Sequence, residues 1–272
     1  MNFTINKRFF YDRLSIVSRA ISVFSPLPAF SGIKIDVSAT DIVLTGSDSD
    51  ISILSTITPS EDNALTINDV GSIVIEAKYI LEVVRKIEGD IIEFEVLDDT
   101  QTRISGDRSQ FKINGMKSTD YPAIDFSRPK DTFEIEADTL KEIITQTCFA
   151  TSDRETRPVL TGVNFSCHDN QLQCVATDSY RLARKMIPME SALQFNITIP
   201  AKSLQEVYKS IGGEKNVTIS VDHKKVQFLI DNTIIQTRLI DGAYPETSRL
   251  IPSSFNYELR IDSHELLSAI DR

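Results

Sequence analysis

The sequence predicts an α+β fold in which two similar domains each pack two helices against antiparallel sheet, with two strand-helix-three-strand units per domain. Three observations support this prediction. The chain repeats itself at an offset of 130 residues. Each copy alternates between segments of period two and segments of period 3.6 in the order strand, helix, three strands, twice over. The helical segments are amphipathic, so each needs a sheet to cover its apolar face.

The repeat runs without a gap through the first part of each copy. Leu27 to Ile33 (LPAFSGI) aligns with Arg157 to Val163 (RPVLTGV) at the offset of 130. Ile75 to Lys78 aligns with Ile199 to Lys202 at an offset of 124, which places a net deletion of six residues between the two helices of the second copy. Other pairs at offset 130 are Phe3 and Phe133, Ile5 and Ile135, Phe10 and Leu140, Ala20 and Ala150, and Asp48 and Asp178. A period this long predicts repeated domains.

The first copy accounts for the chain up to Tyr121-Pro122. Its first unit has a strand at 3–5, a helix at 7–21, a hairpin at 33–37 and 42–44, and a strand at 51–57. Its second unit has a strand at 72–75, a helix at 77–87, and strands at 91–97, 102–105 and 110–114. The apolar stripe of the first helix consists of Phe10, Leu14, Val17 and Ile21. The second copy repeats this order, with helices expected at 138–150 and 201–211.

These patterns predict similar domains in tandem: the first at 1–128, the second at 129–252, and the start of a third at 253–272. The third copy begins at Tyr257 to Ile261 (YELRI), with Asp262 as the N-cap of a helix. The sequence ends at Arg272, before that helix is complete. We therefore expect a truncated product or a fragment of a longer protein.

Composition indicates an ordinary globular protein. Hydrophobic residues make up 41% and charged residues 25% of the 272 residues. No apolar run approaches the roughly 20 residues that cross a bilayer, and the N-terminus has no signal-peptide core. Three cysteines without a CxxC pair predict reduced thiols in a cytosolic protein. The three histidines have no metal-ligand spacing, so no metal or cofactor is expected.

The charge distribution is uneven along the chain. The net charge is −10, which by itself argues against a nucleic-acid partner. The four predicted helices, taken for this count as 7–21, 77–88, 138–150 and 201–211, however, carry +3, +1, −1 and +1, a net +4 that leaves −14 for the rest of the chain. Such segregation is what a molecule needs if its helices face phosphates. Charged helix surfaces that serve only solubility are the alternative.

The stretch Val175 to Lys185 is the clearest candidate for a binding site. A strand is predicted up to Ala176, and a tight turn follows it. The turn consists of Thr177, Asp178, Ser179, Tyr180, Arg181 and Leu182. Its first three side chains are short and can bond the local backbone. Its last three are an aromatic, a guanidinium and an aliphatic group beside a sheet edge, which suits the binding of a partner peptide. An ordinary turn between two strands remains the alternative.

Three motifs within the tandem repeat resemble one known family. They are Ala176 to Leu182 (ATDSYRL), Arg157 to Gly162 (RPVLTG), and Asp241 to Pro245 (DGAYP) followed by Arg249 to Pro252 (RLIP). Together they resemble the bacterial sliding clamp, the beta subunit of DNA polymerase III, over the whole chain from Met1 to Arg272.

The resemblance implies tandem DNA-clamp domains, three per chain, and two chains paired head to tail in a ring. Helices would line a hole around duplex DNA, and sheets would form the rim. The protein would be a processivity factor that tethers the replicative polymerase and that an ATP-driven clamp loader opens and places on DNA. It would carry out no chemistry itself.

The resemblance also implies which residues bind partners and DNA. The partner-peptide pocket would use Leu160, Thr177, Ser179, Tyr180, Arg181, Leu182, Pro245 and Leu250. The DNA-facing cations would be Arg8, Arg13, Arg19, Lys78, Arg85, Arg154, Arg157, Lys202 and Lys209. Leu160 and Leu182 have plain core packing as an alternative role. The family often has Gly-His where this chain has Ser179-Tyr180, and the third domain, with the far wall of the pocket and half of the ring interface, is nearly absent.

Two other functions are considered. A peptide-binding interaction module without DNA encirclement would explain the turn but not the charge segregation. An enzyme would need a site such as a carboxylate pair at Asp48 and Asp50. Asp48 aligns with Asp178, however, and a repeated Asp in a turn is more simply a capping residue. The sequence has no phosphate loop, GxSxG, HExxH or paired Cys and His.

Overall fold

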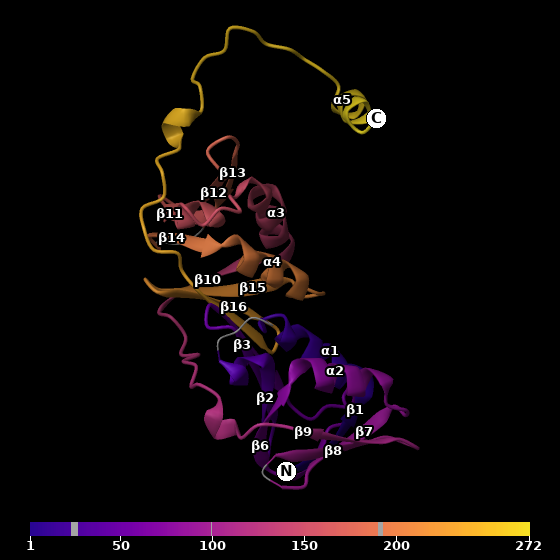
Figure 1. The fold of residues 1–272 in the computed structure, drawn as a ribbon. Helices are drawn as coiled ribbons and strands as arrows, with labels where there is room; N and C mark the ends of the chain where they lie inside the picture. Colours follow the sequence, from indigo (N-terminus) through magenta and orange to yellow (C-terminus); the bar gives the residue numbers. More distant parts are fainter. Residues whose placement is uncertain (23–26, 99, 190–192) are drawn as a thin grey trace. The chain divides into compact units, whose positions relative to one another are not determined.

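A computed structural model describes residues 1–22, 27–98, 100–189 and 193–272, and these divide into two compact units. The first unit is Met1–Gly242, which contains every named strand, and the second is Ala243–Arg272. In the first unit the helices α1 to α4 gather on one side, with the sheets beside them (Figure 1). This is the layered arrangement that the sequence predicts.

The elements of the first unit follow the predicted order. The first copy contains β1 (Asn2–Asn6), α1 (Lys7–Ser18), β2 (Gly32–Val37), β3 (Ile42–Ser47), β4 (Ile51–Ile57), β5 (Thr66–Asp69), β6 (Gly71–Glu76), α2 (Ala77–Lys86), β7 (Ile91–Val96), β8 (Gln101–Ser105) and β9 (Gln110–Asn114). The second copy contains β10 (Asp131–Glu136), α3 (Ala137–Thr147), β11 (Gly162–His168), β12 (Gln171–Thr177), β13 (Leu182–Pro188), β14 (Phe195–Pro200), α4 (Ala201–Ser210), β15 (Asn216–Val221), β16 (Lys225–Ile230) and β17 (Thr233–Arg238).

Two helices end earlier than predicted. After Ser18 the N–H groups of Arg19, Ala20 and Ile21 bond the carbonyls three residues back, so the last turn tightens instead of continuing as α-helix. Likewise, α3 ends at Thr147 and a 3-10 turn, Cys148–Ala150, follows it.

The two copies have the same sheet topology. Strands β1-β7-β8-β9 of the first copy correspond to β10-β15-β16-β17 of the second, and β4-β3-β2-β6 correspond to β13-β12-β11-β14. Every named strand pair is antiparallel. The prediction of two similar antiparallel halves is confirmed. The exception is β5, an unpredicted strand that adds to the outer edge of β1 in the first copy alone.

A continuous sheet joins the two copies. β17 of the second copy pairs with β4 of the first, from Thr233 opposite Ser55 to Thr237 opposite Ile51, so that four strands from each copy form one eight-stranded sheet. The buried hydroxyls of Ser55 and Thr233 lie 3.2 Å apart across this seam. The prediction that sheet edges join neighbouring domains is confirmed.

The helices cover this core with the predicted apolar stripes. Phe10, Leu14 and Val17 of α1 are fully buried, whereas Ile21 beyond the helix end is only partly buried. Phe3 stacks on Phe94 with ring centroids 4.9 Å apart, and both rings meet the edge of Phe10. The three cysteines are free and buried, and Cys174 lies opposite Phe165, not opposite another cysteine.

In the second unit, α5 (Ser263–Ile270) begins as predicted. The Asp262 carboxylate accepts the N–H groups of His264 and Glu265, both at 3.0 Å. The expected strand at Tyr257 to Ile261 is wrong, because no strand forms there. The equivalent strands β1 and β10 pair with β7 and β15, which follow the second helix of each copy, and this sequence ends before that point.

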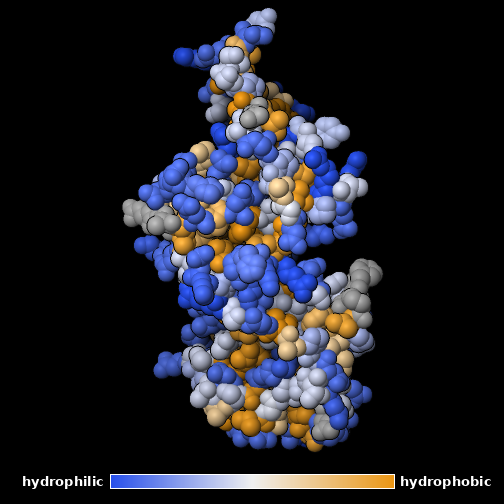
Figure 2. Space-filling model, turned by 90° about the vertical axis from the view of Figure 1, so that its left-hand side faces the viewer, coloured by the Kyte–Doolittle hydropathy of each residue, from blue (hydrophilic) through white to orange (hydrophobic). Residues whose placement is uncertain are grey.

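The surface is mainly polar. Hydrophilic residues cover much of the face shown in Figure 2, with hydrophobic residues in patches between them. Among the described helices, none is both long enough and apolar enough to cross a membrane.

Candidate functional site

The turn after β12 is held by side-chain bonds to its own backbone. The Thr177 hydroxyl accepts the Ser179 N–H at 3.1 Å and donates to the Arg181 carbonyl at 2.7 Å. The Asp178 carboxylate accepts the N–H groups of Tyr180 and Arg181 at 2.9 and 3.0 Å. Ser179 adopts a φ of 79°, which a short polar side chain tolerates better than most. The predicted bonding of short side chains to the local backbone is confirmed for Thr177 and Asp178.

This turn displays Tyr180 and anchors Arg181. Tyr180 is 97% exposed, so its ring contributes no burial to the fold itself. The Arg181 Nε donates to the Asp178 carboxylate at 3.0 Å, and its guanidinium lies 5.8 Å from the ring centroid of Phe149. An exposed aromatic beside an oriented guanidinium is typical of protein-binding surfaces.

The stability of this turn depends on pH through the ionisation of the Asp178 carboxylate. The N–H groups of Arg181 and Tyr180, and then the Arg181 charge, hold the Asp178 pKa below its usual range. Its contribution to the turn is therefore complete above the ordinary Asp pKa of about 3.9 and is lost as the pH falls through the lower folded value.

We expect the Tyr180 and Arg181 amide signals in nuclear magnetic resonance spectra to titrate together below pH of about 4, when Asp178 is protonated. The Asp178→Asn variant keeps an acceptor oxygen without the proton equilibrium, so its amide signals should lose this titration. Titration of the two wild-type amides at or above the ordinary Asp pKa would contradict the stabilised carboxylate.

A hollow of about 400 Å³ lies beside the turn. Of the predicted pocket residues, Leu160, Ser179, Tyr180 and Arg181 line it together. Leu160 forms part of a 3-10 turn (Pro158–Thr161), is 3% exposed, and its carbonyl accepts the Ser152 N–H at 2.8 Å. The remaining lining residues are Thr151, Ser152, Asp153, Arg154, Thr156, Arg157 and Asp178. Arg154 and Arg157, predicted to face DNA, thus border this hollow.

Four predicted pocket residues lie elsewhere. Thr177 is buried and serves the turn, and Leu182 is half-buried at the start of β13, paired with Thr177. Pro245 and Leu250 belong to the second unit, where a 3-10 turn spans Ser248–Leu250. Their part in the pocket stays a prediction. Sequence reasoning missed Phe149 and the segment 151–156, whose only signal was their place between two matched repeat positions.

The first copy contains the same turn with different projecting side chains. The Ser47 hydroxyl accepts the Ser49 N–H, and the Asp48 carboxylate accepts the N–H groups of Asp50 and Ile51 at 3.0 and 2.9 Å. Ser49 has a φ of 87°. Asp50 and Ile51 stand where the second copy has Tyr180 and Arg181. The capping role predicted for Asp48 is confirmed, and this engagement argues against a catalytic Asp48–Asp50 pair.

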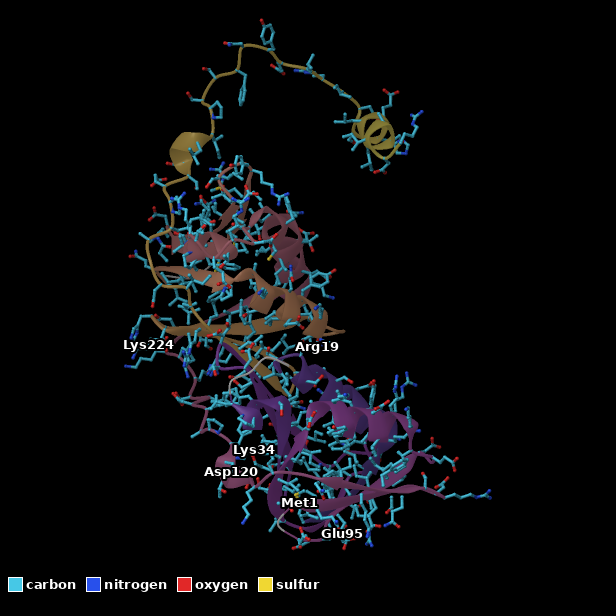
Figure 3. All side chains as sticks on the ribbon, viewed as in Figure 1. Met1, Arg19, Lys34, Glu95, Asp120 and Lys224 are labelled. Carbon is cyan, nitrogen blue, oxygen red and sulfur yellow. The ribbon has the colours of Figure 1, made fainter. Side chains whose placement is uncertain are left out.

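The predicted DNA-facing cations of the helices differ in how free they are. Arg8, Lys78 and Lys202 are exposed and have no ion pair among the described residues. Arg19 lies where α1 ends, and its guanidinium donates to the Ser210 hydroxyl of α4 at 3.2 Å (Figure 3). Two others are paired on their own helices, Arg85 with Glu82 at 3.9 Å and Lys209 with Glu206 at 2.7 Å.

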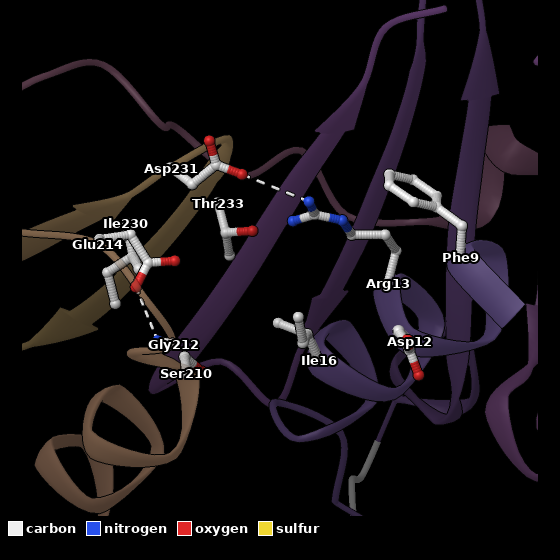
Figure 4. A pocket seen from close by; sticks show the side chains of 10 residues that line it. All are labelled: Phe9, Asp12, Arg13, Ile16, Ser210, Gly212, Glu214, Ile230, Asp231 and Thr233. Atoms are coloured by element: carbon white, nitrogen blue, oxygen red, sulfur yellow. Dashed lines mark hydrogen bonds and ion pairs between the residues drawn. The ribbon is translucent and has the colours of Figure 1, made fainter. Parts of the chain in front are cut away.

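Arg13 instead bridges the two copies. Its guanidinium pairs with the Asp231 carboxylate at 3.3 Å and lies 5.0 Å from the Phe9 ring centroid, and its side chain is only 20% exposed (Figure 4). Phe9, Arg13 and Asp231 line a hollow of about 290 Å³ between α1 and the β16–β17 hairpin. Arg13 therefore has less charge to offer a phosphate than the other cations of α1.

Two family descriptions match successive parts of the chain. Residues 1–125 match the N-terminal domain of the DNA polymerase III beta subunit. Residues 134–246 match the central domain of the same subunit. The matched segments follow the two copies of the repeat.

Individual relatives and solved structures agree with this match. The beta sliding clamp of Staphylococcus aureus is 37% identical over 276 residues, covering 100% of this chain and 73% of the relative. A crystal structure of the DNA polymerase sliding clamp from Bacillus subtilis superposes with a TM-score of 0.96 at 37% identity, over 100% of this chain and 73% of that one. The beta subunit from Streptococcus pyogenes gives 0.94 at 29% identity, with the same coverage.

Proposed function

This chain belongs to the DNA polymerase III beta subunit family, the sliding clamps, and from that premise we propose how its own residues contact DNA and partner proteins. Its function is that of a DNA sliding clamp, a processivity factor of the replicative polymerase. The single observation that carries the residue assignments is the repeat itself, which gives four amphipathic helices on one side of sheets that join edge to edge.

The helices α1, α2 and α4 would face duplex DNA through side chains that are exposed and unpaired. Arg8, Lys78 and Lys202 meet this description. The Arg19 guanidinium makes one hydrogen bond, to the uncharged Ser210 hydroxyl. Contacts of this kind reach phosphates without reading bases, so their strength is independent of sequence and falls with salt. Weak, sequence-independent contact is what allows a ring to slide.

Ring closure would use the two sheet edges that the β4–β17 seam leaves open. In the described residues β9 and β13 are end strands of their sheets. Because β9 corresponds to β17 and β13 to β4, a neighbouring domain would pair its own β4-like strand with β9 or its own β17-like strand with β13. Two three-domain chains joined head to tail by such pairings would close a ring.

The hollow beside Tyr180 would receive a short peptide from the polymerase or from the clamp loader. Leu160 supplies an apolar wall, Tyr180 and Arg181 stand at the rim, and Leu182 follows them at the start of β13. A few such residues are expected to carry most of the binding energy. The chain itself would be non-catalytic, and domains at 1–128 and 129–252 would be the units that the repeat defines.

The test is retention on circular DNA. A three-domain version of this chain, completed with the C-terminal part of the Bacillus subtilis clamp, is loaded by a clamp loader onto nicked plasmid and separated by gel filtration. Encirclement predicts that the protein elutes with circular plasmid at moderate salt and leaves it when the same plasmid is linearised. A peptide-binding module without encirclement predicts equal elution with both DNA forms, and that result would favour the alternative function.

A further inference from the structure

Among the residues that the structure describes, no strand pairs with the outer edge of β10, whereas β5 covers the equivalent edge of β1. In the first copy β5 pairs with β1 and places Ile67 opposite Phe3. In the second copy β10 is the end strand of its sheet, and no named strand among the described residues lies beyond it. The sequence that joins β13 to β14 is shorter than the sequence that joins β4 to β6 and carries β5.

A hollow of about 510 Å³ borders β10. Residues of β10 form one side of it, and Ile187 and Met189 at the end of β13 form another. Phe3 and Ile5 of β1 are 0% exposed, whereas the equivalent Phe133 and Ile135 are 8% and 7% exposed. Phe133 and Ile135 are therefore slightly less covered than their equivalents, although the Phe195 ring stacks on Phe133 with centroids 5.6 Å apart.

The backbone of β10 offers unpaired groups to this hollow. The Ala137 N–H donates to the Lys215 carbonyl of the β15 side at 2.9 Å, just as the Lys7 N–H donates to the Asp90 carbonyl in the first copy. The backbone groups of successive residues in a strand point alternately to the two neighbouring strands. Because the Ala137 N–H points toward β15, the N–H and C=O groups of Glu136 and Glu134 point to the outer edge. In the first copy the N–H of Asn6, the equivalent of Glu136, donates to the Asn63 carbonyl at 2.8 Å.

The charge along this edge identifies the chemistry of the occupant. Asp131, Glu134 and Glu136 are exposed, and Glu134 and Glu136 stand where β1 has neutral Thr4 and Asn6. The Glu134 and Glu136 side chains lie on the face opposite Phe133 and Ile135. A second β10 paired with this edge would set carboxylates against carboxylates, which is destabilising. A strand with basic residues on that face would instead be attracted.

We propose that the β10 edge is a docking site for an extended segment of a partner protein in which basic and apolar residues alternate. The segment adds to β10 as an extra strand, as β5 adds to β1, and its backbone bonds the outward groups of Glu134 and Glu136. One apolar side chain lies opposite Phe133, and the lysines or arginines on either side face the carboxylates. This site is separate from the helices and from the Tyr180 turn.

The probe is a fluorescein-labelled octapeptide, Ser-Lys-Ile-Lys-Val-Lys-Ile-Ser, titrated into the 272-residue chain and followed by fluorescence anisotropy. The control peptide has the same composition with its three lysines in one block. The acidic chain attracts both peptides equally by net charge, so only strand addition separates them. We expect the alternating peptide to bind at least tenfold more tightly, and amide exchange to slow at Glu134 and Glu136 but not at Thr4 and Asn6.

Two variants separate backbone pairing from charge. Glu134→Pro removes an outward N–H and leaves the β15 pairing in place, so it should weaken binding of the alternating peptide at least tenfold. Glu134→Gln keeps the N–H and should weaken binding only about two- to threefold, as expected for loss of one exposed charge pair. If the proline variant unfolds, wild-type chain with a peptide N-methylated at its lysines provides the same comparison.

Three results would overturn the proposal. The first is equal binding of the alternating and block peptides, which would show attraction to net charge alone. The second is binding without slower exchange at Glu134 and Glu136, which would place the peptide elsewhere. The third is slow exchange at these amides in the peptide-free chain together with a dimer in sedimentation, which would assign the edge to a second copy of the chain.

Discussion

Reversing four helix cations should remove most of the salt-sensitive affinity for DNA. In the three-domain ring, Arg8, Arg19, Lys78 and Lys202 are replaced by glutamate. Each phosphate contact contributes about 0.9 to the slope of log affinity against log salt, so the four contacts that one chain loses flatten the slope by roughly 3.6, and the second chain of the ring loses the same four. When salt rises from 50 to 200 mM, four such contacts lower the DNA affinity of the parent by about 10²-fold. The variant should no longer show this part of the fall in affinity.

The measurement is retention on nicked plasmid as a function of salt, with a charge-matched control. The control ring carries glutamate at four exposed cations outside the helices: Arg108, Lys117, Lys130 and Lys224. Both rings change net charge by the same amount, so a difference between them reports where the charges lie. Equal retention of the two variant rings would contradict a DNA-facing role for the helices. Arg13 is left unchanged in both because its pair with Asp231 joins the two copies.

Much of the fold is predictable because the same pattern of strands and helices occurs in both copies of the repeat. Asp48 and Asp178 are equivalent positions in the repeat, and the carboxylate of each accepts the N–H groups of two of the residues that follow it. Helix positions follow from stripes such as Phe10 and Leu14, which must be covered. The join between copies was expected only as edge pairing, because pairing of β17 with β4 depends on which edges remain free after each domain folds.

The elements that were not predicted lack such a local signal. β5 has a single apolar residue, Ile67, and forms because β1 offers it an edge. Similarly, Arg13 reads as a helix-surface cation, yet Asp231 lies opposite it once the copies are joined, 218 positions along the chain. Contacts of this range follow from the assembled sheet, and no sequence pattern encodes them separately.

The residues of the candidate pocket also divide into those that the sequence identified and those that it missed. Tyr180 and Arg181 were identified from the turn in which they stand, and the structure places them at the rim of one hollow with Leu160. Phe149, beneath the Arg181 guanidinium, comes from the 3-10 turn after α3 and carries no motif. Leu160 and Leu182 were assigned equal roles, but their burial differs, which allows binding and stability to be tested separately.

Leu160→Ala should reduce both stability and peptide binding, whereas Leu182→Ala should act mainly on binding. Leu160 is 3% exposed and lines the hollow, so truncation leaves a cavity and should lower the free energy of unfolding by about 2–5 kcal/mol. Leu182 is half-buried, and a loss of about 1–3 kcal/mol in peptide binding is expected if it is a hot spot. Arg181→Ala should cost less, since a rim charge mainly alters the association rate.

Leu140→Ala is the matched control, because Leu140 is a fully buried leucine of α3 that does not line the hollow. Urea denaturation gives the free energy of unfolding of each variant, and calorimetry with one short peptide carrying an aliphatic or aromatic anchor gives binding to the folded fraction. Leu140→Ala should lose stability similar to Leu160→Ala yet bind normally once corrected for unfolded protein. If Leu160→Ala also binds normally after this correction, Leu160 is a core residue and the pocket wall lies elsewhere. Tighter peptide binding by the three-domain version than by the 272-residue chain is expected if the added domain contributes to the pocket, and equal affinity would mean that the added domain contributes nothing to it.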